Sequence, residues 1–394
     1  MNEHQDPRRW MVLAVGLLGL TAGSAAQYGL AVLIPALRTE GHSLETATLL
    51  VTAPIAGVLL TLIAWGAAAD RWGERRILAL GLAGAGVAEL AVSTVDGLLE
   101  RWVFLFVVGA SSASVHAASG RLILGWFAPS ERGLAMGIRQ MGQPLGVASA
   151  AIILAPLAVS GVGNAFVALG IASLAAATLV WLVVRDPARP AHGDGPTSAS
   201  PYRVPFLWRI HVASGFLVIA QYAITLFAFD YLVNVLGWSI AAAGALVAGT
   251  QLAGAASRLA VGWWSDIVRS RLGPMRLVAL AIGIAMTILS ASVYLGTSLA
   301  VGALAVAAVV TVMPNGLAFT AVAERAGPRW AGRAMGIQNT FQNVFATVAA
   351  TPLALLISAA GGGASGYALA YAIVVAFPFA AAVLIPAASE TPQP

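Results

Sequence analysis

Arg258 stands in an otherwise apolar run of the sequence, just before the segment GWWSD at 262–266. A guanidinium keeps its proton in proteins, so in apolar surroundings it needs an anionic partner or water. Its planar fork of N–H donors matches the two oxygens of a carboxylate. Arg258 is therefore a candidate for binding an anion. Two other roles stay open: its head could extend to a polar surface, or it could pair with an internal acid such as Asp230 or Glu89.

Two pairs of polar residues recur at the spacing of one helical turn. Arg139 and Gln143 lie four residues apart, and Gln338 and Gln342 show the same spacing in a similar sequence. Residues four apart share one face of a helix, so these pairs predict polar faces that line a cavity. Arg139 has an alternative role, because a long side chain near a helix end can also extend to the polar surface.

Other polar residues within apolar runs could contact a ligand or carry a proton. His116 could bind a substrate or titrate near neutral pH, and a packed, neutral histidine is the alternative. Asp230 and Glu89 are candidate proton carriers, because burial favours the protonated carboxyl, or they are partners in structural ion pairs. The remaining candidates for ligand contact are Asn315, Gln27, Tyr28, Gln221 and Tyr222.

The composition predicts that these residues are held in a membrane. Only 9% of the 394 residues are charged, whereas soluble proteins carry about 25%, and the mean hydropathy is +0.86. No cysteine and no lysine occurs, which excludes disulfides, thiolate metal sites, cysteine nucleophiles and a lysine Schiff base. The arginines are spread through short loops and form no stripe, so we expect no nucleic-acid partner.

Apolar runs separated by charges, glycines and prolines predict an all-α membrane protein with twelve transmembrane helices. The predicted spans are 10–37, 46–69, 76–95, 101–127, 134–159, 163–184, 210–235, 240–265, 275–294, 298–322, 333–358 and 366–387. The first run is longer than the apolar core of a signal peptide, about 7–15 residues, so we expect it to be retained. Residues 185–207 are rich in Pro, Gly and Ser and predict a cytoplasmic linker between two six-helix bundles, 1–184 and 208–394.

The distribution of arginines predicts the orientation of these spans. With both termini inside, sixteen of the 21 basic residues fall on the cytoplasmic side. Basic residues are enriched on that side of membrane proteins. We therefore expect a multi-pass protein of the plasma membrane with both termini in the cytoplasm.

The two halves of the chain repeat one another. Four pairs of similar segments occur in the same order: 26–28 with 220–222, 41–43 with 237–239, 66–70 with 262–266, and 135–143 with 334–342. The offsets stay between 194 and 199, so the chain is a duplicated six-span unit in which His116 corresponds to Asn315. Duplicated halves are typical of transporters, which bind substrate at the interface of the halves and open alternately to each side.

Charge is concentrated in the segment GAAADRWGERR at 66–76, between the second and third predicted spans. Its pattern, G-x-x-x-D-R-x-G-x-R-R, resembles the signature loop of the major facilitator superfamily, and the twelve spans and the duplication strengthen the resemblance. We also expect Gly66 to allow close approach of two helices. The resemblance implies a role in gating for Gly66, Asp70, Arg71, Gly73, Arg75, Arg76 and, in the second copy, Gly262 and Asp266.

The resemblance also implies how the gate works. In that family the loop aspartate faces the N-terminus of a helix in the other half, here the span that starts near Gly332, and helps to close the cytoplasmic side. The alternative is that these charges only set the orientation. The second copy has Ile267 where the arginine would be, which puts its role in doubt. The span-5 signature of drug–proton antiporters is absent, and Leu105 stands where many antiporters have an arginine.

Arg258 carries a further resemblance. The frame R-x-x-x-G before the second loop resembles the span-8 arginine of oxalate/formate and monocarboxylate porters, which binds the substrate carboxylate. We therefore expect a non-enzymatic secondary transporter of a small organic anion, coupled to protons or to another anion. An exporter of neutral or cationic molecules and a non-transporting membrane receptor are the alternatives. We expect membrane lipid around a monomer, and no cofactor and no metal site.

Overall fold

The computed structural model describes residues 8–127, 135, 138–186, 200–327 and 330–386, and these residues form helices and short connections without any strand. Eleven helical segments among them are long and apolar enough to cross a membrane. The one predicted span that is not among these eleven is 76–95, which corresponds to α4 (Glu74–Val92), a helix of 19 residues with charges near its start and the buried Glu89. The prediction of an all-α membrane fold is confirmed.

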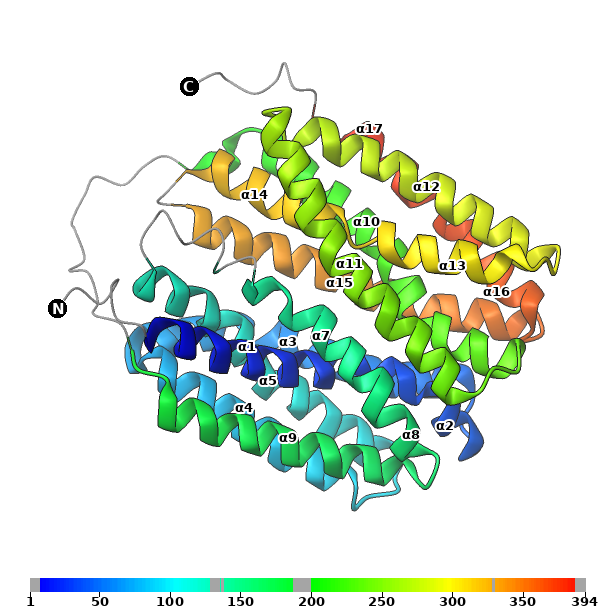
Figure 1. The fold of residues 1–394 in the computed structure, drawn as a ribbon, viewed down its shortest axis with the longest axis horizontal. Helices are drawn as coiled ribbons and strands as arrows, with labels where there is room; N and C mark the ends of the chain where they lie inside the picture. The colour runs from blue at the N-terminus through cyan, green and yellow to red at the C-terminus, as the bar shows by residue number, and fades with distance from the viewer. Residues whose placement is uncertain (1–7, 128–134, 136–137, 187–199, 328–329, 387–394) are drawn as a thin grey trace. The chain divides into compact units, whose positions relative to one another are not determined.

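Helices of the first half of the chain are labelled in Figure 1. Their bounds are α1 (Arg8–Tyr28), η2 (Gly29–Leu33), α2 (Ile34–Thr39), α3 (Leu44–Trp72), α4, α5 (Leu98–Trp126), α7 (Gly142–Ser149), η3 (Ala150–Leu154), α8 (Ala155–Ala158) and α9 (Val162–Val183). The second half has η4 (Pro201–Arg203), α10 (Phe206–Asp230), η5 (Tyr231–Val235), α11 (Ile240–Ile267), α12 (Leu272–Tyr294), α13 (Leu299–Val310), α14 (Pro314–Ala326), α15 (Ala331–Ala359), α16 (Ala364–Val374) and α17 (Ala376–Leu384).

Several predicted spans consist of two or three helical pieces, and prolines lie at three of the interruptions. Pro35 follows the tight turn η2, Pro156 follows the wide turn η3, and Pro314 begins α14. A proline has no N–H to donate and its ring displaces the preceding turn, so the helix narrows or widens there. These pieces still form continuous spans, such as 8–39 and 299–326.

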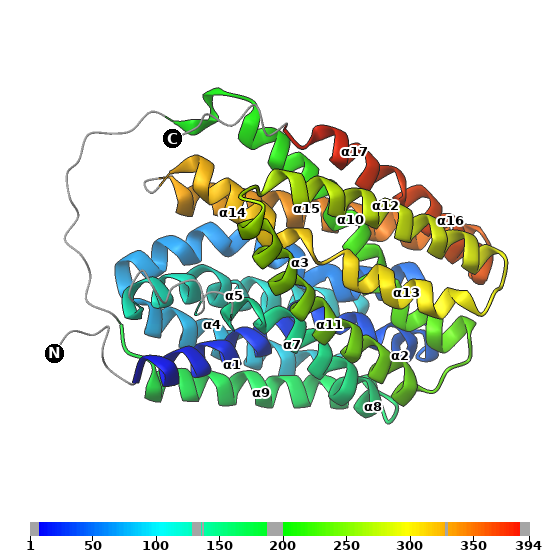
Figure 2. The same cartoon turned by 45° about the horizontal axis from the view of Figure 1, so that its top comes forward.

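The chain divides into two compact units. Unit 1 comprises residues 1–193 and 239–248, and unit 2 comprises residues 194–238 and 249–394. In unit 1, α4 packs against α5 and α9, α3 packs against α5, and α1 contacts α7 and α9 (Figures 1 and 2). Close approach of α4 and α9 depends on Gly86 and Gly170, where an added Cβ would fall 2.9 and 3.0 Å from backbone oxygens of the facing helix.

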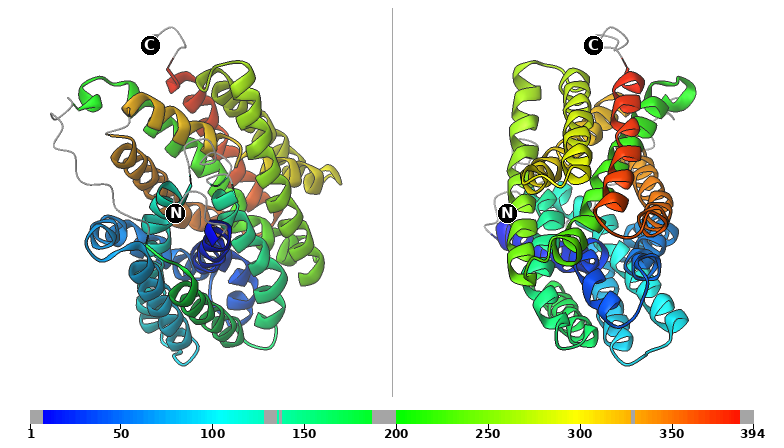
Figure 3. Two further views of the ribbon diagram at one scale, coloured as in Figure 1. Left: turned by 60° about the vertical axis from the view of Figure 1, so that its left-hand side comes forward. Right: turned by 90° about the vertical axis from the view of Figure 1, so that its right-hand side faces the viewer.

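In unit 2, α10 is central, since it packs against α14, α15 and α17. The outer helix α12 contacts α13, α16 and α17, which Figure 3 shows from two further directions. Nearly all of α10 is buried, including His211, Gln221 and Asp230. The polar side chains of unit 2 are therefore held within its helix packing.

Candidate functional site

In unit 1 a polar cluster joins α1 to α5. Gln27, 1% exposed, lies at the end of α1 and donates from Nε2 to Ser112 Oγ at 2.7 Å. Its Oε1 lies 2.9 Å from Nε2 of His116, one helical turn beyond Ser112. The ring of Tyr28 meets the His116 ring edge-on, with centroids 6.3 Å apart. The structure thus brings together three of the predicted ligand-contact residues.

Arg139 lies beside this cluster. Its Nε donates to Ser119 Oγ at 2.9 Å, and its Nη2 donates to the backbone oxygen of His116 at 3.3 Å. A third contact, from Nη1 to the amide oxygen of Gln140, is 3.1 Å long. Gln143, one turn further along the chain, is half-buried and makes no side-chain hydrogen bond within the described residues.

In unit 2 a second cluster joins α10, α14 and α15. Asn315 Nδ2 donates to Gln221 Oε1 at 2.9 Å, and Gln342 Nε2 donates to Ser214 Oγ at 2.7 Å and to Asn315 Oδ1 at 3.4 Å. Gln338 contacts Nδ1 of His211, whose Nε2 lies 3.0 Å from the Tyr202 hydroxyl. Tyr222, beside Gln221, is buried. His211 was missed at the sequence level, although a single histidine in the apolar run of α10 was a signal.

The two clusters contain the same contact at positions that the repeat makes equivalent. In unit 1, Gln27 pairs with His116, and in unit 2, Gln221 pairs with Asn315, each at 2.9 Å. The sequence register predicted the equivalence of these positions but not the contact. Serines that complete the clusters, Ser112, Ser119 and Ser214, were also missed, because serine is common wherever helices pack closely.

Arg258 in α11 is half-buried, and its Nε donates to the backbone oxygen of Val312 at 3.1 Å. No ion pair of Arg258 occurs within the described residues. Asp230 instead accepts hydrogen bonds from the Tyr367 hydroxyl and from Asn234 Nδ2, the latter at 2.6 Å. Glu89 is buried in α4, where it faces Ser173 of α9. The alternative that Arg258 pairs with one of these two acids is therefore wrong for this structure.

The charged loop of unit 1 is held by the start of the linker. Gly73 joins α3 to α4 with φ +92°, and Arg75 N, in the first turn of α4, donates to Asp186 Oδ1 at 2.7 Å. The Arg75 side chain donates to the backbone oxygen of Trp181 at 2.7 Å and lies 4.5 Å from the centre of its ring. Asp186 therefore places a carboxylate at the N-terminus of α4, where the helix dipole favours negative charge.

The structure describes the side chains of only some of the other predicted gating residues of this loop. Arg71 and Arg76 are exposed, and Arg71 lies 5.8 Å from the ring centre of Trp72. The side chain of Asp70 lies outside the described part of the chain. A Cβ added at Gly66 would meet no described atom within 4 Å, and the same holds for Gly262, so the close helix approach expected at Gly66 stays a prediction.

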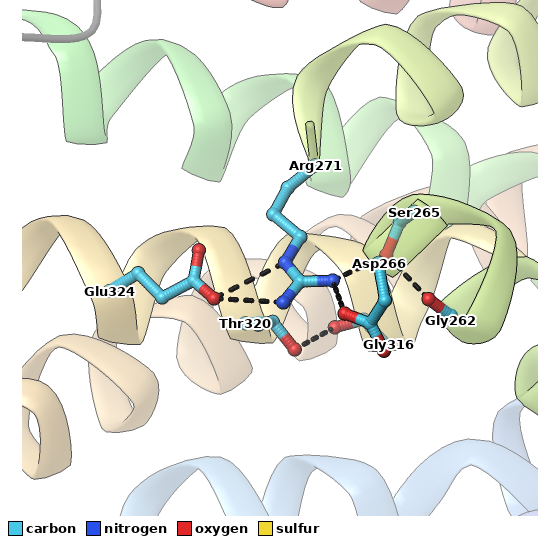
Figure 4. A network of polar contacts seen from close by, with 7 residues as sticks. All are labelled: Gly262, Ser265, Asp266, Arg271, Gly316, Thr320 and Glu324. Atoms are coloured by element: carbon cyan, nitrogen blue, oxygen red, sulfur yellow. Dashed lines mark hydrogen bonds and ion pairs between the residues drawn. The ribbon is translucent and has the colours of Figure 1, made fainter. Parts of the chain in front are cut away.

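Figure 4 shows the corresponding loop of unit 2, where Arg271 connects α11, α12 and α14. Its guanidinium bonds to Asp266, to Ser265 Oγ at 2.6 Å, and twice to Glu324 Oε1, at 3.1 and 3.2 Å. Burial lowers the pKa of Arg271, but its hydrogen bonds to Asp266 and Glu324 and their negative charges outweigh it and raise that pKa overall. Arg271 thus supplies the cation that Ile267 cannot, and it was missed because it lies four residues beyond that position.

A family model described as Major Facilitator Superfamily matches residues 12–351. An uncharacterised MFS-type transporter of Mycobacterium tuberculosis is 43% identical over 337 residues, which cover 84% of this chain and 76% of the relative. A probable nitrate/nitrite transporter, NarK2, of the same species is 30% identical over 246 residues, which cover 59% of this chain and 60% of the relative.

Two solved structures have a similar fold. A bacterial homologue of the human lysosomal transporter Spinster, in an inward-facing and occupied conformation, has a TM-score of 0.80 at 19% identity, covering 97% of each chain. A D-xylose–proton symporter has a TM-score of 0.78 at 14% identity, covering 95% of this chain and 97% of the symporter. At these identities the likeness extends to the fold alone.

Proposed function

Since the chain belongs to the major facilitator superfamily and is a transporter rather than an enzyme, we propose that its substrate is a small organic anion, carboxylate-like, moved by alternating access. One observation carries this proposal. Arg139 and Arg258 are guanidiniums within membrane-spanning segments, and their hydrogen bonds within the described residues go only to neutral oxygens. A desolvated positive charge without a counter-charge is costly, and a bound anion would supply the missing negative charge.

The form of the two guanidiniums supports a carboxylate as the bound group. Arg139 and Arg258 each use Nε on a neutral acceptor, at 2.9 and 3.1 Å. The Nη atoms of Arg258 make no hydrogen bond within the described residues, so they are available to a planar oxyanion. We also propose neutral contacts to the substrate from the polar residues of each unit. They are Gln27, Tyr28 and Gln143 in unit 1, and Gln221, Tyr222, Asn315, Gln338 and Gln342 in unit 2.

Nitrate is the second candidate, and the name of one relative favours it. NarK2 is a probable nitrate/nitrite transporter, and nitrate shares with carboxylates a planar group of oxygens that accepts two parallel hydrogen bonds. The exporter of neutral or cationic molecules remains the alternative outside the anion class, with Arg258 then structural.

Coupling to protons or to a second anion is part of the same proposal. Among the two carboxyls expected to carry a proton, Asp230 already accepts hydrogen bonds from Asn234 and Tyr367 within the helix packing. Glu89 is buried and faces the Ser173 hydroxyl, and it forms no ion pair within the described residues, which suits the neutral form. Glu89 is therefore the better candidate of the two.

The predicted topology and gate complete the proposal. Residues 1–184 and 208–394 would move as two bundles joined by the linker 185–207, in a monomer of the plasma membrane with both termini in the cytoplasm. The loops around Asp70 and Asp266 would close the cytoplasmic side. Asp186 and Arg271 support this role, because each fixes one of these loops by charged hydrogen bonds.

Counterflow in proteoliposomes tests the proposed substrate class. Vesicles are loaded with formate, lactate, oxalate or nitrate, with a neutral sugar and an organic cation as controls, and uptake of the labelled compound is followed. Wild-type protein should accumulate at least one anion, and Arg258→Gln should not. The matched control is Arg276→Gln, which removes the same charge near the start of α12, where Arg276 donates to the backbone oxygen of Ile385. Transport of only the sugar or the cation would refute the anion as substrate and favour the exporter of neutral or cationic molecules.

A further inference from the structure

The repeated contact of the two units separates what His116 does for the fold from what it could do chemically. His116 Nε2 contacts Gln27 Oε1 at 2.9 Å, and in unit 2 the amide nitrogen of Asn315 contacts Gln221 Oε1 at the same distance. An asparagine therefore suffices to hold the glutamine. What the histidine adds is a second ring nitrogen that can take up a proton.

The hydrogen bonds around Gln27 determine which nitrogen that is. Ser112 Oγ donates to the backbone oxygen of Gly109 at 3.3 Å, so it accepts from Gln27 Nε2. Gln27 Oε1 is then an acceptor, and His116 Nε2 must carry a hydrogen. Nδ1 makes no hydrogen bond within the described residues. A proton can therefore add at Nδ1 without breaking either bond of the Gln27 cluster.

Arg139 links this proton to an anion. Among the described residues, the charged or titratable groups in contact with His116 are Arg139, which donates to its backbone oxygen at 3.3 Å, and Tyr28, whose ring lies 6.3 Å away. The positive charge of Arg139 opposes a second positive charge on the imidazole. An anion bound to Arg139 removes that opposition, so each ligand favours the other.

We infer that His116 carries a coupling proton, which adds to Nδ1 from the aqueous phase when an anion binds at Arg139. This inference rests on the proposed anion transport. The balance is one proton for each monovalent anion, and the loaded site then has the same net charge as the empty one. Glu89 faces Ser173 of α9 and is not among the hydrogen-bond partners of Gln27, His116 or Arg139 within the described residues, so it lacks this direct link to the anion.

Proton uptake by the purified protein in detergent tests the inference, with formate and nitrate as probes. In weak buffer with a pH indicator, wild-type protein should take up about one proton for each anion bound. Its anion affinity should rise about tenfold for each unit of falling pH in the range where the free site is neutral. His116→Asn should bind the anion with a pH-independent affinity and take up no proton. His42→Asn, at a loop histidine between α2 and α3, is the matched control and should behave as wild type.

The outcomes separate the inference from the proposed function. If neither anion binds to the wild type, the inference is overturned, and the proposed function fails with it if lactate and oxalate also give no counterflow. If an anion binds without proton uptake, or if His116→Asn takes up the proton as the wild type does, only the inference is overturned. Loss of uptake in Glu89→Gln alone would assign the proton to that carboxyl. His116→Gln provides a second variant if His116→Asn has a lowered Tm.

Discussion

Replacement of Arg258 by glutamine separates an anion-binding arginine from a structural one. In the structure the guanidinium donates to the backbone oxygen of Val312 at 3.1 Å and pairs with no described acid. Loss of that bond costs about 1.5–3 kcal/mol, because the donor is charged. The variant also no longer buries a charge without a counter-charge, which offsets part of the loss. We therefore expect the free energy of unfolding to change by about 1 kcal/mol or less.

The effect on the ligand should be larger than the effect on the fold. A charge-assisted hydrogen-bonded pair between a guanidinium and a carboxylate contributes about 1.5–3 kcal/mol, which corresponds to roughly a tenfold to 150-fold loss of affinity. Arg258→Lys should recover little of this, because an ammonium lacks the planar fork. The measurements are the Kd of formate and nitrate from intrinsic tryptophan fluorescence, and the Tm in detergent, for both variants and the wild type.

Two results would refute this reasoning. An unchanged Kd for every anion in Arg258→Gln would remove Arg258 from the binding site. A large fall in Tm that Asp230→Asn or Glu89→Gln then restores would show that Arg258 neutralises an internal acid. The second result is unexpected, because Asp230 already accepts two hydrogen bonds and Glu89 faces Ser173.

Three further substitutions test other contacts of the fold. Gly73→Ala should lower the free energy of unfolding by about 1–3 kcal/mol, because φ is +92° and the added Cβ would overlap the Asp186 carboxylate. Gly237→Ala, at φ +69° in open space, is the control that measures the cost of the backbone conformation alone. An equal loss of Tm in both variants would exclude a role for the overlap. Arg271→Gln should cost about 1 kcal/mol or less at low salt and nothing measurable at about 1 M salt, since its acidic partners are 54–64% exposed; a salt-independent loss in chemical denaturation would contradict this. Asp230→Asn should cost about 1–3 kcal/mol, because an amide has a single acceptor oxygen where the carboxyl now accepts from both Tyr367 and Asn234; an unchanged Tm would contradict this.

The amino-acid sequence by itself determined the helical membrane fold, the duplication and the equivalence of positions in the two halves. Hydropathy over about 20 residues and the placement of arginines are local properties, so they predict spans without knowledge of packing. The register of the repeat then identified Gln27 with Gln221 and His116 with Asn315. Glycines and the charges between spans also located both loops, including Asp266.

The partners of these side chains were decided only by the tertiary structure. Gln27 and His116 are 89 residues apart, and their contact depends on how α1 and α5 are rotated about their axes, which hydropathy does not encode. The same reason explains Asp186 at the start of α4 and Arg271 between Asp266 and Glu324, because loops far apart in the chain meet only once the helices pack. Arg258 is the clearest case. Sequence reasoning left three partners open, an internal acid, a bound anion or the polar surface, and the packing of α11 against the turn at Val312 placed it beside a neutral carbonyl.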